Sequence, residues 1–224
     1  MTRAVGETVD VTPAKRPEPV TLPGRYGRVE KLDAEKHGAQ LWETLKGQDE
    51  VWDYMFHGPF SEPEPFGDYI RMLASSEDPY AFAILDDHEM ALGFATLMEI
   101  RPAMRVIEVG NILYAPRLQR TPLATEVQFL LARYAFEALG YRRYEWKCNA
   151  LNLPSRRAAE RFGFTFEGIF RQHMIVKGRN RDTAWFSMTD QEWPSRKAAF
   201  EGWLAPGNFD TQGRQKKKFE VFRD

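Results

Sequence analysis

The stretch that decides the fold runs from Glu108 to Ser155 and reads EVGNILYAPRLQRTPLATEVQFLLARYAFEALGYRRYEWKCNALNLPS. Apolar runs typical of strands alternate there with apolar residues at helical spacing. The pattern predicts two strands and two helices in alternation, at 106–114, 121–139, 144–148 and 152–162. A loop that leads from a strand into a helix exposes the free N–H groups of the helix N-terminus, and these groups can bind a phosphate.

The entry into the long helix has the residues that such an entry requires. Thr121 can cap the helix, and Pro122 is favoured at the first helical position. Arg117 and Arg120 add positive charge at the same place. Two interpretations fit these residues alone: a site for a phosphate or pyrophosphate, and an ordinary capped helix with solvated arginines.

The rest of the chain extends this alternation into a mixed sheet. Further strands are predicted at 25–32, 80–85 and 91–100, and a long hairpin at 164–176 and 182–189 across the turn 177–180. Further helices are predicted at 33–45, 66–73 and 192–203, whereas the aromatic-rich and proline-rich stretch 51–66 predicts no regular structure. Runs of strands with interposed helices indicate an α+β fold, a central, mostly antiparallel mixed sheet flanked by helices.

Three parts of the chain differ in composition. Residues 1–24 contain four prolines among charged and small residues, which indicates a leader that is mobile or draped over the domain. Residues 25–204 form the expected domain, and a chain of 224 residues that is 43% hydrophobic can bury one core of this size. Residues 205–224 contain three consecutive lysines and are expected to be an exposed tail.

Composition also excludes several classes of protein. The net charge of −1 argues against a nucleic-acid partner, although the clustered arginines Arg142–Arg143, Arg156–Arg157 and Arg179 with Arg181 leave a local anion site open. Cys148 is the only cysteine, so it forms no intramolecular disulfide, and it is expected to be a small buried strand residue. The absence of a signal-peptide core and of a membrane-length apolar run predicts a cytoplasmic protein.

Four short patterns stand in order along the chain: Glu108–Gly110, Gln119–Glu126, Asn152–Ser155 and Arg161–Phe164. Together they resemble the GNAT superfamily and, within it, the ribosomal-protein-type N-acetyltransferases that act on N-terminal alanine or serine. The resemblance spans residues 25–193. It implies a GNAT-type acyl-CoA N-acyltransferase fold, acetyl-CoA as cosubstrate, no metal, and a primary amine as acceptor, either a protein N-terminus or a small amine.

The same resemblance implies which residues hold the cofactor. The residues that would wrap the pyrophosphate of CoA are Gln119, Arg120, Thr121, Leu123, Ala124 and Thr125. Pro122 departs from the family pattern, because it replaces a glycine and has no N–H to donate. Asn152 matches the residue that contacts the pantetheine arm, and the strand through Val109–Leu113 would pair with the pantetheine amide like an added strand.

Acetyl transfer needs a base that takes a proton from the amine and a group that protonates the departing thiolate. Glu108, on the strand beside the loop, is the first candidate for the base, and His173 is the second. Ser155 matches a position that some relatives place near the thiol. Each of the three residues has a structural alternative. Glu108 fits a solvated or salt-bridged strand residue, His173 fits a structural histidine, and Ser155 fits the N-cap of the helix that follows. Met174 stands where some relatives have a carboxylate, so the base is not assigned by resemblance.

The acceptor and the oligomeric state are not fixed by sequence. Acceptor contacts are expected from the aromatic stretch 52–66 and the hairpin turn 177–181, whereas the carboxylates of Glu62, Glu64 and Asp68 fit a solvated loop. The apolar residues Phe200, Trp203 and Leu204 fit either a dimer contact or a cover for the core. Two other functions stay open: a non-catalytic acyl-CoA-binding or regulatory module on the same fold, and, ranked third, a nucleotide-binding protein.

Overall fold

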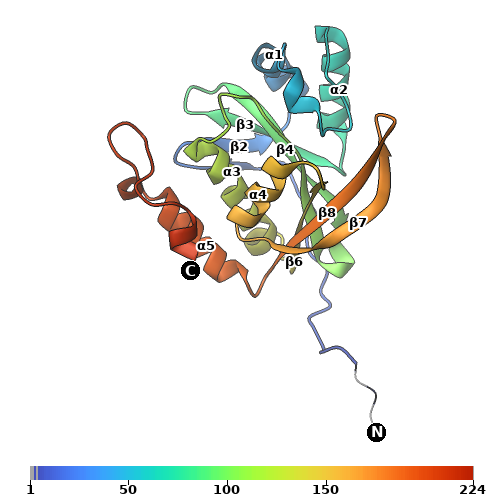
Figure 1. Ribbon diagram of the computed structural model, residues 1–224, viewed down its shortest axis with the longest axis vertical. Helices are drawn as coiled ribbons and strands as arrows, with labels where there is room; N and C mark the ends of the chain where they lie inside the picture. Colours follow the sequence, from blue (N-terminus) through green and yellow to red (C-terminus); the bar gives the residue numbers. More distant parts are fainter. Residues whose placement is uncertain (1–2, 4, 224) are drawn as a thin grey trace.

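One eight-stranded sheet, with the order β1-β2-β3-β4-β5-β6-β8-β7, organises the chain (Figure 1). The computed structural model describes residues 3 and 5–223. The strands are β1 (Thr21–Pro23), β2 (Gly27–Lys31), β3 (Tyr80–Asp86), β4 (Ala91–Arg101), β5 (Val106–Tyr114), β6 (Arg143–Asn149), β7 (Thr165–Val176) and β8 (Arg179–Thr189). The helices are α1 (Ala34–Leu45), α2 (Pro63–Ser75), α3 (Pro122–Arg133), α4 (Leu153–Arg161), α5 (Trp193–Leu204) and α6 (Glu220–Arg223). Among the described strands only β5 and β6 pair in parallel, so the predicted α+β fold with a mostly antiparallel sheet is confirmed.

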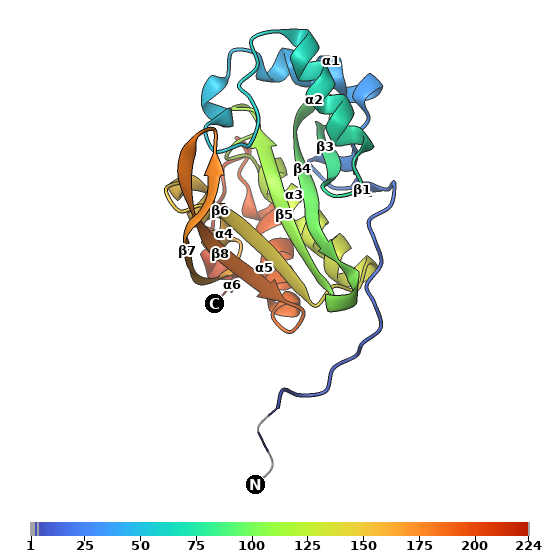
Figure 2. The same ribbon diagram turned by 90° about the vertical axis from the view of Figure 1, so that its right-hand side faces the viewer.

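Each face of the sheet buries its own core, and alternation along β3 shows how. Phe82 and Ile84 point to a first core that also contains residues of α3 and α5. Ala81, Ala83 and Leu85 point to a second core, which is shared with α1 and α2. Figure 2 shows α3 and α5 behind the sheet and α1 and α2 at its upper end. The second face is therefore covered by helices over only part of its area.

The residues at their N-termini explain where two of the helices begin. Asp33 caps α1 by accepting hydrogen bonds from the N–H groups of Glu35 and Lys36. Helix α2 begins at Pro63, three residues before the predicted start, because proline is favourable in a first helical turn. The predicted irregular stretch 51–66 is correspondingly shorter and opens with a 3₁₀ turn at Asp49–Trp52.

The long helix predicted at 121–139 is not one α-helix. Helix α3 ends at Arg133 and continues as a π-helical turn at Tyr134–Ala138. Gly140 follows with a φ of +80°, the left-handed conformation that glycine adopts most readily at a helix end. The wider turn, which periodicity does not distinguish from an α-helix, brings Phe136 against Trp193 with ring centroids 5.2 Å apart.

The leader is draped over the domain from Ala14 onward. The Ala14 N–H donates to the Pro102 carbonyl, and the Glu18 N–H donates to the Tyr134 hydroxyl. The sequence did not predict β1, which pairs with β2 at the edge of the sheet.

The β7–β8 hairpin is longer than predicted. Its turn consists only of Lys177 and Gly178, with φ values of +49° and +70°, and β8 begins at Arg179 instead of Asp182. Two successive residues with positive φ form the two-residue turn whose twist matches that of paired strands. The hairpin therefore projects as a continuous ribbon beside β6 (Figure 1).

The C-terminal segment is only partly the exposed tail that was expected. Lys216, Lys217 and Lys218 are exposed, but Phe219 is 1% exposed and belongs to the first core. It contacts the ring of Phe200 at a centroid distance of 4.9 Å. The apolar residues Phe200, Trp203 and Leu204 are likewise buried in the first core. Of the two interpretations given above, a dimer contact or a cover for the core, the structure agrees with the cover.

Candidate active site

The parallel strands β5 and β6 separate halfway along their length. Their pairing begins at Val106 with Arg143 and ends at Val109 with Trp146. Beyond that point β5 stays paired only with β4, and β6 stays paired only with β8. The sheet therefore splits between the two strands, and no other described strand pairs with the edge of β5 that faces β6 over Gly110–Tyr114.

A bulge in β5 accompanies the split. Phe94 pairs with Leu113 and Thr96 pairs with Gly110, so Asn111 and Ile112 together oppose the single residue Ala95. Asn111 has a φ of +46°. A bulge increases the local twist and redirects backbone groups, and bulges are common beside functional sites.

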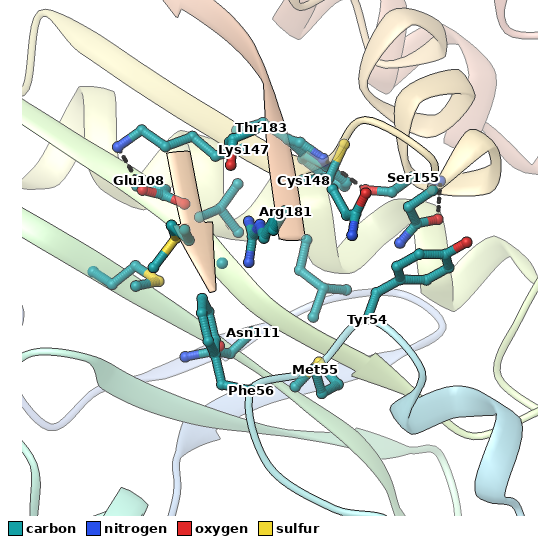
Figure 3. Close-up of a pocket in the computed structure, with 18 of the residues that line it drawn as sticks. Tyr54, Met55, Phe56, Glu108, Asn111, Lys147, Cys148, Ser155, Arg181 and Thr183 are labelled. Atoms are coloured by element: carbon teal, nitrogen blue, oxygen red, sulfur yellow. Dashed lines mark hydrogen bonds and ion pairs between the residues drawn. The ribbon is translucent and has the colours of Figure 1, made fainter. Parts of the chain in front are cut away.

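A cavity of about 380 Å³ opens at the split (Figure 3). Strands β5, β6 and β8 form its floor and sides, and the segment Val51–Phe56 forms an opposite wall. The predicted stretch 52–66 and the hairpin meet here: Lys177 Nζ donates to the Trp52 carbonyl at 2.9 Å. The carboxylates of Glu62, Glu64 and Asp68 do not line the cavity and are exposed.

Glu108 lies in this cavity and is 5% exposed. It points away from the first core, because its neighbours Ile107 and Val109 point into it. Its carboxylate forms an ion pair with Lys147 Nζ at 2.8 Å. Burial nevertheless raises the pKa of Glu108 to about 7, since the attraction of Lys147 only partly offsets the loss of hydration.

Lys147 is shared between two carboxylates. Its Nζ lies 3.0 Å from Glu145 as well as 2.8 Å from Glu108, and 4.1 Å from the ring centroid of Trp185. Glu145 also pairs with Arg143 and Arg101, which together with Lys147 hold its pKa below the usual value despite burial. Glu145 therefore stays ionised near neutral pH, whereas Glu108 can exchange a proton there.

Ser155 lies across the cavity from Glu108, in the first turn of α4 (Figure 3), and Asn152, just before this helix, also lines the cavity. Asn152 is the N-cap of this helix, since its side chain accepts from the Ser155 N–H at 3.0 Å. The interpretation of Ser155 as an N-cap is therefore wrong, and its hydroxyl accepts a hydrogen bond from Trp146 Nε1 instead. Cys148 is buried beside Ser155, and burial raises the pKa of its thiol.

His173 lies at the rim of the cavity. Its side chain is exposed, and Nδ1 is 3.0 Å from the Thr183 hydroxyl. The structure thus brings Glu108, Ser155, Asn152 and His173 to one cavity. Leu113 does not line the cavity, because its side chain is buried in the second core.

The expected cofactor loop lies outside the cavity, at the N-terminus of α3. Thr121 caps the helix, and its hydroxyl accepts from the Ala124 N–H at 3.1 Å. The Thr125 hydroxyl accepts from Arg161 at 3.1 Å, and Leu123 is buried in the first core. Gln119 and Arg120 are exposed.

The sequence interpretation missed Thr183 and Trp185, whereas Arg181 ends the hairpin turn 177–181 that was expected to contact the acceptor. Arg181, Thr183 and Trp185 take alternate positions on β8 and face the cavity together. Trp185 lies on the cavity side of the sheet. The period of two would have grouped these residues, whereas the register that sets them against β6 cannot be read from sequence. Tyr54 and Phe56 come from the segment that was expected to contact the acceptor.

Metal and membrane features are absent from the described residues. No cluster of three or more His, Cys, Asp or Glu side chains suited to a metal ion occurs among residues 3 and 5–223. Within the same part of the chain, no helix has the length and apolarity needed to cross a membrane.

Comparisons with known proteins identify the fold. A structure of a GCN5-related N-acetyltransferase from Brucella melitensis is 50% identical, with a TM-score of 0.93 over 95% of this chain and 98% of that chain. A "probable acetyltransferase" of the GNAT family from Chromobacterium violaceum is 38% identical, with a TM-score of 0.80 over 87% of this chain and 98% of that chain. The predicted GNAT-type fold is thereby confirmed.

Sequence comparisons agree with the structural ones. The "Putative ribosomal N-acetyltransferase YdaF" of Bacillus subtilis is 30% identical over 105 residues, which are 47% of this chain and 57% of that protein. The match thus spans little more than half the length of that relative. The sequence profile of the family "Acetyltransferase (GNAT) domain" matches residues 29–165, more than half of the chain. The predicted resemblance to acyl-CoA-dependent N-acetyltransferases is therefore confirmed, and the chain belongs to the GNAT acetyltransferase family.

Proposed function

We propose that this protein transfers an acetyl group from acetyl-CoA to a primary amine by direct attack in a ternary complex. The observation that carries the proposal is the split between β5 and β6, which opens into the cavity that contains Glu108. The unpaired edge of β5 offers backbone groups that an extended pantetheine amide can pair with. The N-terminus of α3, with Arg117 and Arg120 nearby, supplies positive potential for the phosphates of CoA.

In the proposed reaction, the amine nitrogen attacks the thioester carbonyl carbon, and a tetrahedral oxyanion forms. The C–S bond then breaks, so that an amide and the CoA thiolate result. Glu108 is the proposed base, because a carboxyl group with a pKa near 7 can accept the amine proton at neutral pH. His173, at the rim of the cavity, is the second candidate for this role.

The proton that the thiolate needs can come from Ser155. Its hydroxyl accepts from Trp146 Nε1 and lies within hydrogen-bonding reach of the Cys148 thiol, so its hydrogen must turn from that thiol to serve a group in the cavity. Cys148 beside it is a poor nucleophile, because burial raises the pKa of its thiol. This arrangement favours direct transfer over an acyl-cysteine intermediate.

Calorimetric titration with acetyl-CoA tests the cofactor, with ATP and NAD as controls. Saturable binding of acetyl-CoA alone supports the proposal, and release of free thiol with an amine then establishes transfer. Binding without thiol release across a broad amine panel would favour the non-catalytic acyl-CoA-binding module, to which Pro122 and Met174 lend some support. Lack of acetyl-CoA binding would contradict both functions.

A further inference from the structure

Arg181 places a buried positive charge in the cavity, and no carboxylate of the described residues forms an ion pair with it, although Glu108 attracts it at longer range. The Arg181 side chain projects from β8 into the centre of the cavity, and the residue is 7% exposed (Figure 3). Its Nε is buried and has no hydrogen-bond partner in the described part of the chain. The guanidinium lies over the ring of Phe56, 4.9 Å from its centroid.

An unpaired buried guanidinium is costly in free energy. Burial removes its hydration, and arginine does not escape the cost by losing its proton at any physiological pH. Cation–π contact with one ring recovers only part of the lost interaction. A bound anion would complete the site by pairing with the planar donors of the guanidinium, which match a carboxylate in two parallel hydrogen bonds.

Strand β5 contributes the group proposed to accept a proton to the same cavity. The carboxylate of Glu108 is paired with Lys147, at 2.8 Å, and forms no ion pair with Arg181. The lining of the cavity also includes the apolar side chains of Met98 and Ile112. The cavity thus has a proton-accepting carboxyl group and an unpaired guanidinium as separate polar sites, in surroundings that strengthen electrostatic interactions.

We propose that Arg181 binds a carboxylate of the acceptor, so that the acceptor is a small molecule with both an amine and a carboxylate, such as a free α-amino acid. This inference rests on the proposed acetyl transfer and specifies its substrate class. The amine faces Glu108, where it loses its proton, while the carboxylate pairs with Arg181. A protein N-terminus fits less well, because the carbonyl next to its amine is an uncharged amide.

Other anions of the reaction fit Arg181 less well. The phosphates of CoA belong at the N-terminus of α3, and none of the expected loop residues between Gln119 and Thr125 lines the cavity. The tetrahedral oxyanion forms with every acceptor. If Arg181 served that oxyanion, its removal would slow all acceptors equally. A carboxylate site instead predicts a loss confined to acceptors with a carboxylate.

The first test uses the unaltered protein. Free thiol release is measured with glycine, L-methionine and L-phenylalanine, each beside its amide and its decarboxylated amine. We expect kcat/KM to be about 100-fold higher for the amino acids than for the amides, since the amide leaves a buried charge unpaired. The amides lose their amine proton more readily, so intrinsic reactivity predicts the opposite order. Amides that react equally well, or better, would overturn the inference while leaving acetyl transfer intact.

The second test removes the charge. Arg181→Met should lower kcat/KM for the amino acids about 100-fold, mainly through KM, and change that for the amides less than threefold. Arg181→Lys should retain part of the preference, and Arg171→Met, at an exposed arginine of β7, should retain all of it. An equal loss for all acceptors in Arg181→Met would overturn the inference. Acetyl-CoA titration of each variant reports folding, and lack of binding by the unaltered protein would instead contradict the proposed function.

Discussion

At the scale of single residues, the state of Glu108 depends on the charges around it. Burial favours its neutral form, Lys147 favours its ionised form, and Glu145 competes for the same Lys147 ammonium group. The pKa of about 7 that results suits a base, because the group is ionised often enough to accept a proton and basic enough to hold it.

Glu108→Gln should remove this base with little effect on acetyl-CoA affinity. In the unaltered protein, kcat/KM should rise with pH through about 7 as the Glu108 carboxyl loses its proton. The variant should lack this rise and be slower at pH 8 by roughly 10²–10⁴-fold, keeping only the rise caused by the amine substrate. The measurement is kcat/KM between about pH 5.5 and 9.5. A rise near pH 7 that persists in the variant would assign it to another group, with His173 as the next candidate.

Lys147→Met should move the same rise to higher pH. Lys147 lowers the pKa of Glu108, so without the ammonium group the buried carboxyl group holds its proton more tightly. Lys147→Arg keeps the positive charge and serves as the matched control. The readout is the pH midpoint of kcat/KM, which a purely structural role of Lys147 would not shift. A midpoint that moves down, or stays in place, would contradict this account of Glu108.

At the scale of elements, the site exists because β5 and β6 pair for four residues and then part. The bulge at Asn111 and the N-terminus of α3 lie beyond the split, on the same strand-loop-helix unit. One continuous piece of chain thus supplies a free strand edge and a helix N-terminus. This is why the segment from Glu108 to Ser155 predicts the fold more strongly than any other part of the sequence.

Thr121→Ala tests the helix entry. The Thr121 hydroxyl accepts from the Ala124 N–H, and loss of such a cap costs about 1 kcal/mol of unfolding free energy. We also expect weaker acetyl-CoA binding, because the first turn of α3 loses the group that fixes it. Thr121→Ser retains the hydroxyl and should behave like the unaltered protein. Denaturant unfolding and calorimetric titration measure the two effects, and unchanged acetyl-CoA affinity in Thr121→Ala would separate this turn from cofactor binding.

Local pattern allowed prediction of most elements, and contacts across the sheet account for what it missed. Thr121 and Pro122 mark the start of a helix in the sequence, and the structure confirms it. The role of Lys147 depends on the parallel register of β5 and β6, and that of Arg181 on the packing of β8 against the segment Val51–Phe56. Such registers join residues far apart in the chain, so no local pattern encodes them.

At the scale of the whole molecule, segments from both ends of the chain complete the domain. Residues of the leader bond to the Pro102 carbonyl and to Tyr134, and the C-terminal segment returns to the first core. Phe219 is the anchor of that return. It packs edge-on against Phe200 and Phe162, and the guanidinium of Arg161 lies 5.0 Å from its ring centroid.

Phe219→Ala should therefore destabilise the protein by about 3–5 kcal/mol, the usual cost of removing a buried aromatic ring. Arg161 also packs on this ring and donates to the Thr125 hydroxyl in helix α3, so the loss should weaken acetyl-CoA binding as well. Lys217→Ala, two residues earlier and exposed, is the control and should change stability by less than about 0.5 kcal/mol. Denaturant unfolding measures the first effect and calorimetric titration at low temperature the second. Equal unfolding free energies for both variants would mean that the C-terminal segment is an exposed tail in solution and does not pack on the core.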